Sequence, residues 1–581
     1  MFNHRLKYKN FTWLRVLLVT LLVLGVFFRL VNLDRKVYWY DEGFTSLRVG
    51  GYTIPEVVQS FNGQVIGVAD FRNQYLSPKS ERGFFGTIKS LAVEDPQHPP
   101  LYYLITHLWM HLFGNSVAAI RSLTALSSLL VFPCAYWLCL ELFNSRLVGW
   151  ICVALIAVSP FHVLFAQEAR EYSLWTVMIL LSSAALLQAI RLKSVYSWAI
   201  YALTLGIALY TFLFSAFIAI GHGIYVIGTE GFRLSKTVIA YLKATFIAFI
   251  AFLPWIWVVI SNYGRLKDST SWMTEAKIPL LQLAYLSAKN IGNIFFKSTR
   301  FENILLLLIL SLVAYSIYFI CRYTSKKVWL FIITLFGVTQ LALIIPDVIS
   351  GGQRSVMPRF LIPCYLSIEL VVSYLIATGI TPNSKIVLTN RQVAKNAKSG
   401  TKRKFQLLSR FDVNDITFEQ IRIRQQRFWL FVMIVIFTGG VISSAIFTQL
   451  EVPWTKLKNY NDYKVARMIN RASNPLVVVS NYQTRDDPNV SFMFSFSHLL
   501  DANVKLQLVE GKDIPQIPNG YSDVFLYNPC AQSSGEEIEQ GFKVLLSELE
   551  RGQNYKAEPV RISQPVLLWR LEKQSITMNK W

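Results

Sequence analysis

Two adjacent carboxylates, Asp41 and Glu42, end the segment Tyr38-Trp39-Tyr40-Asp41-Glu42, just beyond the first strongly apolar stretch of the chain. Carboxylates are costly inside lipid, so an acidic pair that follows a membrane exit and is flanked by aromatic residues is a candidate for chemistry. Such a carboxylate can take a proton from an attacking hydroxyl group. The alternative is an interfacial loop, in which Trp and Tyr anchor at the membrane surface and the acids face water.

Further polar residues fall on the same predicted side of the membrane as this pair. They are His98, Gln167, Glu168, Arg170, Glu171, Arg354 and Arg359. Arginine holds phosphate or diphosphate through bidentate, charge-assisted hydrogen bonds. Acids and arginines gathered at one membrane face therefore suit a phosphate-bearing substrate, and the membrane position implies that a lipid carries it.

Each of these residues also has a simpler explanation when it is taken alone. Glu168 and Arg170 could form a local surface ion pair, which contributes little to stability. Arg354 and Arg359 could be interfacial residues whose charged ends reach water, and Arg121 near the outer end of a span could do the same. The joint placement on one face is the argument for a site.

Composition places these residues in a polytopic membrane protein. Of the 581 residues, 53% are hydrophobic, and the mean hydropathy is +0.38. The net charge of +22 is concentrated in short basic clusters between apolar segments. The positive-inside rule describes this pattern, so the charge reports orientation and does not indicate a nucleic-acid partner.

We predict eleven membrane-spanning helices from the apolar segments. They lie near residues 13–31, 117–140, 147–165, 173–190, 196–213, 215–229, 237–260, 303–321, 328–346, 359–379 and 428–449. With the N-terminus in the cytoplasm, every basic cluster is cytoplasmic and the C-terminus is extracytoplasmic. Leu101–Phe113 is too short to span with ease, and we interpret it as a helix in the outer interface. The predicted location is the plasma (inner) membrane.

The chain divides into four predicted regions. Residues 1–380 form a transmembrane module that includes the outer loop 32–116, residues 381–427 a basic cytoplasmic loop, 428–449 the last span, and 450–581 a small extracytoplasmic α/β domain. In that domain we expect helices at Tyr460–Ser473 and Glu536–Arg551. We expect strands at Leu476–Ser480, Val504–Val509, Val524–Tyr527 and near Val566–Leu571. The domain has no nucleotide-binding glycine motif, and we assign it no chemistry.

With this topology, the motifs resemble those of a known class. Asp41-Glu42, followed by His98-Pro99-Pro100-Leu101-Tyr102-Tyr103, resembles the multi-span glycosyltransferases of the GT-C class. The closer similarity is to the bacterial family 39 group, which is protein-mannosyltransferase-like and aminoarabinose-transferase-like. Gln167-Glu168-Ala169-Arg170-Glu171-Tyr172 looks like the second outer loop of that group. Arg359-Phe360-Leu361-Ile362-Pro363 resembles its Arg-Tyr-Leu-x-Pro segment, and the resemblance covers about residues 10–380.

The resemblance implies transfer of a hexose or pentose on the outer face, from a polyprenyl-phosphate sugar to a glycolipid, polysaccharide or protein acceptor. Asp41 is then the candidate base, Glu42 its neighbour in the acidic motif, and Glu168 the second outer-loop acid. Arg170 and Arg359 would face the donor phosphate. The other expected substrate-binding residues are His98, which stands where some relatives carry Lys, and Gln167, Tyr172 and Arg354.

Cofactor use stays open in the sequence. No CxxC or HExxH spacing suggests a metal cage. An acidic pair can hold Mg²⁺ or Mn²⁺ against a phosphate, yet some relatives work without a metal, so no metal is assigned. Three other functions compete with sugar transfer. Glycoside hydrolysis also uses two carboxylates but leaves the arginines unexplained; the others are a transporter or flippase of lipid-linked saccharides and a non-catalytic cell-envelope scaffold.

Overall fold

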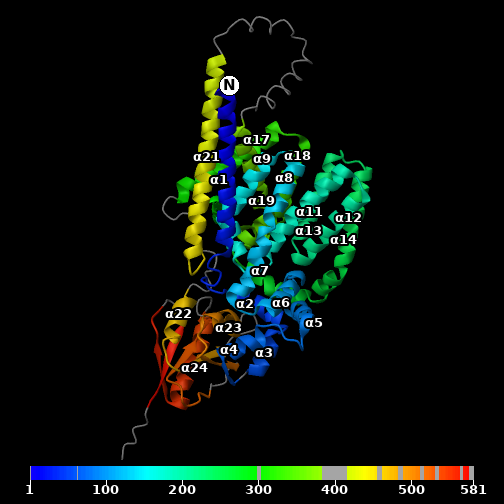
Figure 1. Cartoon of the computed structure of the whole chain (residues 1–581). Helices are drawn as coiled ribbons and strands as arrows, with labels where there is room; N and C mark the ends of the chain where they lie inside the picture. Colours follow the sequence, from blue (N-terminus) through cyan, green and yellow to red (C-terminus); the bar gives the residue numbers. More distant parts are fainter. Residues whose placement is uncertain are drawn as a thin grey trace, which may run out of the picture.

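The structure is a computed structural model, and it describes residues 2–61, 63–297, 302–381, 415–453, 461–481, 489–510, 516–529, 536–562 and 567–574. Figure 1 shows a long bundle of helices with a smaller part, made of helices and a sheet, at one end. The N-terminal end of the first helix lies at the opposite end of the bundle from this smaller part.

Apolar helices build the bundle because their backbone groups are bonded within each segment, which lipid requires. They are α1 (Phe2–Leu30), α7 (Val117–Leu129), α8 (Val131–Phe143), α9 (Arg146–Val158), α10 (Pro160–Ala166), α11 (Tyr172–Leu192), α12 (Val195–Thr211), α13 (Ser215–Thr229), α14 (Lys236–Ser261), α17 (Glu302–Tyr323), α18 (Lys326–Ser350), α19 (Ile362–Ile380) and α21 (Asp415–Gln449). Every predicted span coincides with helix in this set.

By length and composition, eight helical stretches of the described chain can cross a membrane, or nine if the bent pair α9–α10 is one span. The remaining two predicted spans correspond to α12 and α13, which are apolar but only 17 and 15 residues long. The prediction of a helical polytopic membrane protein is therefore confirmed. Helix α21 begins at Asp415, before the predicted start at residue 428; residues 382–414 of the predicted basic loop lie outside the described residues.

The outer loop is mostly helical. It contains α2 (Tyr40–Gly50), α3 (Ile54–Phe61), α4 (Val68–Tyr75), α5 (Gly83–Glu94), α6 (Leu101–Phe113) and a short strand, β1 (Val65–Gly67). Helix α6 matches the segment predicted to lie in the interface. Two further connections contain short elements. Between α14 and α17 lie α15 (Tyr263–Thr270), η1 (Ser271–Met273) and α16 (Leu280–Phe295), and between α18 and α19 lie η2 (Arg354–Val356) and η3 (Pro358–Leu361).

The C-terminal region contains the α/β arrangement that the sequence predicts. Its strands are β2 (Pro475–Asn481), β3 (Lys505–Glu510), β4 (Asp523–Tyr527), β5 (Tyr555–Pro559) and β6 (Leu568–Lys573), and its helical elements are α22 (Asp462–Ile469), α23 (Asn489–Phe496), η6 (Ser497–Leu499) and α24 (Glu536–Gln553). The sheet order is β1-β3-β2-β4-β6-β5. Strand β2 is parallel to β3 and β4, and the other pairs are antiparallel.

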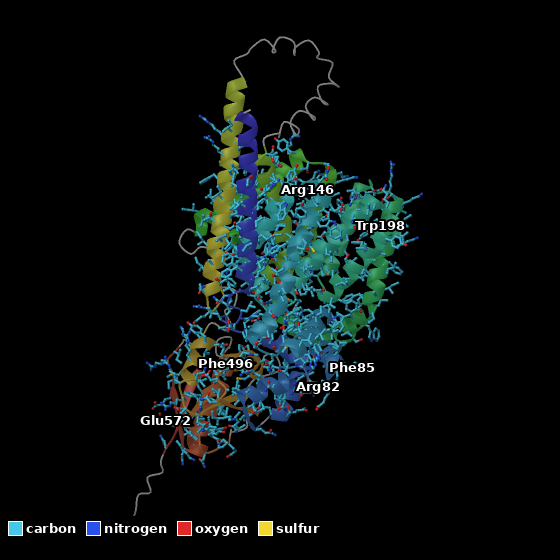
Figure 2. All side chains as sticks on the ribbon, in the orientation of Figure 1. Arg82, Phe85, Arg146, Trp198, Phe496 and Glu572 are labelled. Carbon is cyan, nitrogen blue, oxygen red and sulfur yellow. The ribbon has the colours of Figure 1, made fainter. Side chains whose placement is uncertain are left out.

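The outer loop and the C-terminal region share one sheet and one core. Strand β1 pairs with β3 as the edge strand, with Ile66 opposite Leu506. Buried side chains of the loop, including Phe61 and Phe71, pack in one hydrophobic cluster with tail residues such as Phe494. Figure 2 places Arg82 of the loop and Phe496 of the tail in this part, whereas Arg146 and Trp198 lie in the bundle. The predicted domain of residues 450–581 therefore leaves out a contribution from the loop.

Candidate active site

Asp41 lies in the first turn of α2, where the helix joins the bundle. Its Oδ2 is 3.0 Å from Nη1 of Arg359, which comes from η3 immediately before α19. The two side chains are 23% and 17% exposed, so this ion pair is accessible from outside the protein. Arg359 also lies beside the rings of Trp39 and Trp272, with its guanidinium carbon 5.9 Å and 5.3 Å from their centroids. A carboxylate and a phosphate-binding type of side chain thus share one partly open position.

Glu42, the neighbour of Asp41, is buried and points away from that opening. Its carboxylate accepts hydrogen bonds from Nε and Nη2 of Arg121 at 2.8 Å and 2.6 Å. It also accepts from the backbone N–H of Ala169 at 2.7 Å and from that of Trp39 at 3.1 Å. The last bond belongs to the capping box that begins α2. Glu42 therefore fixes the start of α2 against the second outer loop.

Arg121 reaches Glu42 from α7 and also orders the chain that leads into α2. Its guanidinium donates to the backbone oxygens of Leu33, Lys36 and Val37. The explanation of Arg121 as a side chain that extends to the membrane surface is wrong, because only 2% of it is exposed. A buried guanidinium with these partners sets the path of residues 33–37 and the position of the carboxylate pair.

Gln167 holds the same region from the other side. Its amide nitrogen donates to the backbone oxygens of Phe28 and Val31 at 2.8 Å and 2.7 Å, and its Oε1 accepts from Lys36. The side chain is buried. The structure thus assigns Gln167 a contact that ties the end of α1 to the second outer loop. Lys36, whose ammonium group also lies 4.3 Å from the ring centroid of Phe447, was missed in the sequence.

Arg170 lies behind Asp41 and is buried. Its Nη1 donates to the backbone oxygen of Asp41 and to Oγ1 of Thr45, each at 3.2 Å. Its Nε is 3.4 Å from Oε2 of Glu171, and its Nη2 is 3.2 Å from Nε2 of His98. Arg170 therefore supports the first turn of α2 while it adds positive charge beside the Asp41 carboxylate.

His98 and Glu171 complete this cluster. Nδ1 of His98 lies 2.9 Å from Oε1 of Glu171. Because an arginine N–H can only donate, Nε2 of His98 faces Arg170 as an acceptor, and its proton sits on Nδ1 toward Glu171. Burial alone raises the pKa of Glu171, but the charge of Arg170 and the hydrogen bond from His98 outweigh burial and lower this pKa to about 2. Glu171 stays ionised and orients both partners.

The remaining predicted site residues differ in how they relate to Asp41. Glu168 is buried, and its charge acts on both Arg121 and Arg359. Tyr172 begins α11 and is buried; the Arg170 guanidinium carbon lies 5.9 Å from its ring centroid. Arg354 makes a separate ion pair, with its Nη1 2.7 Å from Oδ1 of Asp347 on α18. Among the described residues, the contacts of Arg354 are with Asp347 and Gly351 and do not include the Asp41 cluster.

Metal-binding groups are sparse in the described part of the chain. No set of three or more His, Cys, Asp or Glu side chains comes together there in a way that could hold a metal ion. At the acidic motif, both Glu42 oxygens accept hydrogen bonds, whereas the Asp41 side chain is partly exposed. Asp41 is accordingly the member of the pair that could contact an added cation.

The fold and the site together define a polytopic helical membrane protein. A helical bundle carries an acid-and-arginine cluster at one end, and a mixed α/β region packs over the helix that bears the acid.

Comparisons with known proteins agree with this class. Residues 97–257 match the family model described as dolichyl-phosphate-mannose-protein mannosyltransferase. The chain is similar to the crystal structure of ArnT from Cupriavidus metallidurans bound to undecaprenyl phosphate, with a TM-score of 0.54 and 12% identity over 97% of this chain and 99% of that one. For ArnT in the apo state, the TM-score is 0.51 and the identity 13%, over 96% and 98% of the two chains. A comparison with curated proteins finds no match.

The predicted resemblance to the GT-C class and its family 39 group is thereby confirmed. At identities this low, the likeness to the two structures shows a shared fold, and the family match covers the segment from Gln97 to Trp257. These findings support a membrane glycosyltransferase as the general kind of protein. The roles of the individual site residues and the orientation of the termini stay predictions.

Proposed function

We propose that this protein is an integral-membrane glycosyltransferase that moves a sugar from a polyprenyl-phosphate donor to a hydroxyl group of a lipid, glycan or protein acceptor. The observation that carries the proposal is the pair of Asp41 and Arg359, 3.0 Å apart in a partly open position at the end of the bundle. Displacement at an anomeric carbon needs a base for the acceptor and a stabilised leaving group, and these two side chains can supply them.

Each side chain has a definite part in this proposal. Asp41 takes the proton from the acceptor hydroxyl as the new glycosidic bond forms. Arg359 binds the donor phosphate, with Arg170 adding charge from behind, and so stabilises the phosphate that leaves as the old bond breaks. Glu168, which is buried and interacts electrostatically with Arg359, orients the acceptor. Because a phosphate on Arg359 would compete with Asp41 for the guanidinium, donor binding would release the base.

A lipid-linked donor is supported by two observations. The site lies at one end of a bundle whose exposed side chains are largely apolar, so a substrate with a polyprenyl tail can reach it from within a bilayer. The ArnT structure of similar fold was solved with undecaprenyl phosphate. The predicted outer-face location, and the choice between hexose and pentose and among acceptors, belong to the proposal as well.

The test is transfer of radiolabelled sugar from a panel of polyprenyl-phosphate sugars in membranes that contain the wild type, Asp41→Asn or Asp70→Asn. Asp70 is a matched control because it also lies in the first turn of an outer-loop helix, α4, and is exposed. We expect the Asp41 variant to lose about 10²- to 10⁴-fold in turnover, the range for general acid–base catalysis. The Asp70 variant should keep wild-type activity at equal expression.

Equal transfer by wild type and Asp41→Asn would remove Asp41 from the chemistry. No transfer by the wild type across the donor panel would contradict the enzyme proposal and favour a transporter, flippase or scaffold. The same assay with EDTA, Mg²⁺ or Mn²⁺ measures whether turnover requires a divalent ion, for which Asp41 would be the available carboxylate ligand.

A further inference from the structure

Inside the bundle, the span formed by α9 and α10 is broken. The two helices meet at Ser159 and Pro160 with a bend of 62°. Pro160 has no backbone N–H, so it cannot donate to the carbonyl oxygen of Ile156, and the bend also interrupts the next bonds of the helix. Backbone oxygens released in this way need other partners when they are buried in a membrane protein.

Arg29, in the last turn of α1, supplies those partners. Its Nη2 donates to the backbone oxygen of Ile156 at 2.9 Å, and its Nη1 donates to that of Ala157 at 2.6 Å. The next carbonyl, of Val158, accepts from Oγ of Ser444 on α21 at 3.0 Å. Arg29 is buried, and α1 approaches α9 closely because Gly25 faces Ala157, where a Cβ on Gly25 would be 2.6 Å from Cβ of Ala157.

A buried carboxylate balances the Arg29 charge and reaches the other side of the break. Glu369 on α19 is fully buried and acts electrostatically on Arg29. Its Oε2 lies 2.9 Å from Nε2 of His162 on α10. Placing a charged side chain inside a membrane bundle costs free energy, so such residues usually have a function. Arg29, Glu369 and His162 thus link α1, α19 and α10 around the bend.

The end of α1 also holds the far end of α10. Gln167, the residue after α10, donates to the backbone oxygens of Phe28 and Val31, which flank Arg29. Helix α10 has only seven residues, so the end of α9 before it and Gln167 after it are both tied to the last turns of α1. The residues that follow it are Glu168, Ala169, whose N–H donates to Glu42, and Arg170.

We propose that Arg29, together with Glu369 and His162, positions the active-site segment 167–171 from within the bundle. The inference rests on the proposed function for its effect on sugar transfer. These three are positioning residues, since they touch the broken span and not the Asp41 cluster. Replacing them should let α10 and the segment after it shift, and a displacement of about 1 Å at a reacting group can cost about 100-fold in rate.

The test compares Arg29→Gln, Arg29→Lys and Glu369→Gln with the control His222→Gln in purified full-length protein. His222 on α13 is equally buried and bonds Ser183 and Tyr201, away from the break. Two quantities are measured on variants whose thermal unfolding midpoint matches that of the wild type. One is hydrogen–deuterium exchange of the peptides covering residues 160–171, which needs no activity, and the other is turnover in sugar transfer.

We expect Arg29→Gln to speed exchange in 160–171 by about 10-fold or more and to lower turnover by about 10- to 100-fold. Lysine keeps the charge but has one nitrogen for two carbonyl oxygens. Exchange and turnover of Arg29→Lys should therefore lie between those of Arg29→Gln and the wild type. Glu369→Gln should act in the same direction, which keeps the test open if Arg29→Gln does not fold; His222→Gln should match the wild type. Unchanged exchange in both Arg29→Gln and Glu369→Gln would overturn the positioning role. Faster exchange in a protein whose wild type transfers no sugar would overturn the proposed function alone.

Discussion

Glu42 and Arg121 form a buried ion pair, with their closest atoms 2.6 Å apart and exposures of 1% and 2%. Removing one member of such a pair leaves the other charge buried without compensation. We therefore predict that Arg121→Met lowers the free energy of unfolding by about 3–5 kcal/mol. The measurement is denaturant unfolding of the detergent-purified protein.

The matched control for this prediction is Arg191→Met. Arg191 also bonds a glutamate, Glu141, at 2.7 Å, but 58% of its side chain is exposed. A surface pair of this kind is worth about 0–1 kcal/mol. Similar losses in the two variants would contradict the view that burial makes the Arg121 pair important.

The stability of the folded protein should depend on pH through Lys36. Burial, helped by the charge of nearby Arg121, lowers its pKa from 10.5 to about 7. Between about pH 7 and 10.5 the unfolded chain therefore binds this proton more strongly than the folded chain, so stability rises with pH across that window. We predict that Lys36→Met removes this part of the rise, because methionine keeps the apolar stem and has no titrating group.

Unfolding midpoints of wild type and Lys36→Met, measured in steps from pH 7 to 10, check this prediction. The wild type should gain more stability than the variant over the series. Parallel curves would show that Lys36 has the same pKa in the folded and unfolded chain.

At the residue level, the sequence could indicate which polar side chains are unusual but not which of them meet. The basic clusters set the predicted orientation, which places Asp41, Arg170 and Arg359 on one side of the membrane. Their contacts join segments up to 318 residues apart and depend on how the helices pack. For the same reason, Arg354 was grouped with them although it pairs with Asp347, and the buried roles of Arg29 and Lys36 were missed.

At the level of elements, helix α2, which carries Asp41, packs closely against α23. Gly43 of α2 lies against the backbone of α23; a Cβ there would be 2.7 Å from the nitrogen of Ser495 and 2.9 Å from the carbonyl carbon of Phe494. Phe44 and Tyr40 of α2 also pack against rings of α23. A methyl group at Gly43 must therefore push the two helices apart.

We predict that Gly43→Ala destabilises the protein by about 1–3 kcal/mol, the cost of overpacking, and lowers sugar transfer because α2 carries Asp41. The control is Gly206→Ala, inside α12, where nothing lies within 4 Å of the added Cβ. That change should be neutral or stabilise by up to about 1 kcal/mol. Thermal midpoints and turnover of the two variants are compared; a Gly43→Ala protein as active and stable as wild type would contradict the tight contact.

The spans were the easiest elements to predict because each is a long apolar run with basic flanks. Helix α23 was missed because Asn489–Phe496 is short and mostly apolar, without the periodicity that separates a helix from a strand. Strand β1 was missed because three residues in a long loop carry no alternation, and its pairing with β3 is a tertiary contact. The bend at Pro160 fell inside one predicted span, since composition alone does not show where a helix turns.

At the level of the whole molecule, the outer loop and the tail fold as one body. Phe61, Phe71 and other loop side chains have their core partners in the tail. We predict that a chain ending after Leu450 inserts its bundle but leaves the loop without a core. Limited proteolysis should cut this variant between residues 52 and 90 faster than it cuts the full chain, and sugar transfer should be lost.

A truncated chain with a protease-resistant loop would contradict the shared core. Sugar transfer by the truncated chain with an altered acceptor preference would also contradict the shared core. It would mean that the tail selects acceptors and does not support α2. The two readouts are independent, since proteolysis needs no substrate.

Because β1 pairs with β3, strand β1 stays unpaired during synthesis until β3 has been made. Gly67 and Lys505 are partners in the sheet, yet most of the bundle separates them along the chain. Ribosomes add about 5–20 residues per second, so roughly 20–90 s pass between the emergence of the two strands. Throughout that time the loop has left the ribosome with an unpaired strand and an uncovered apolar face. We therefore expect that slowing translation late in the message exposes this loop for longer and increases degradation of the unfinished chain.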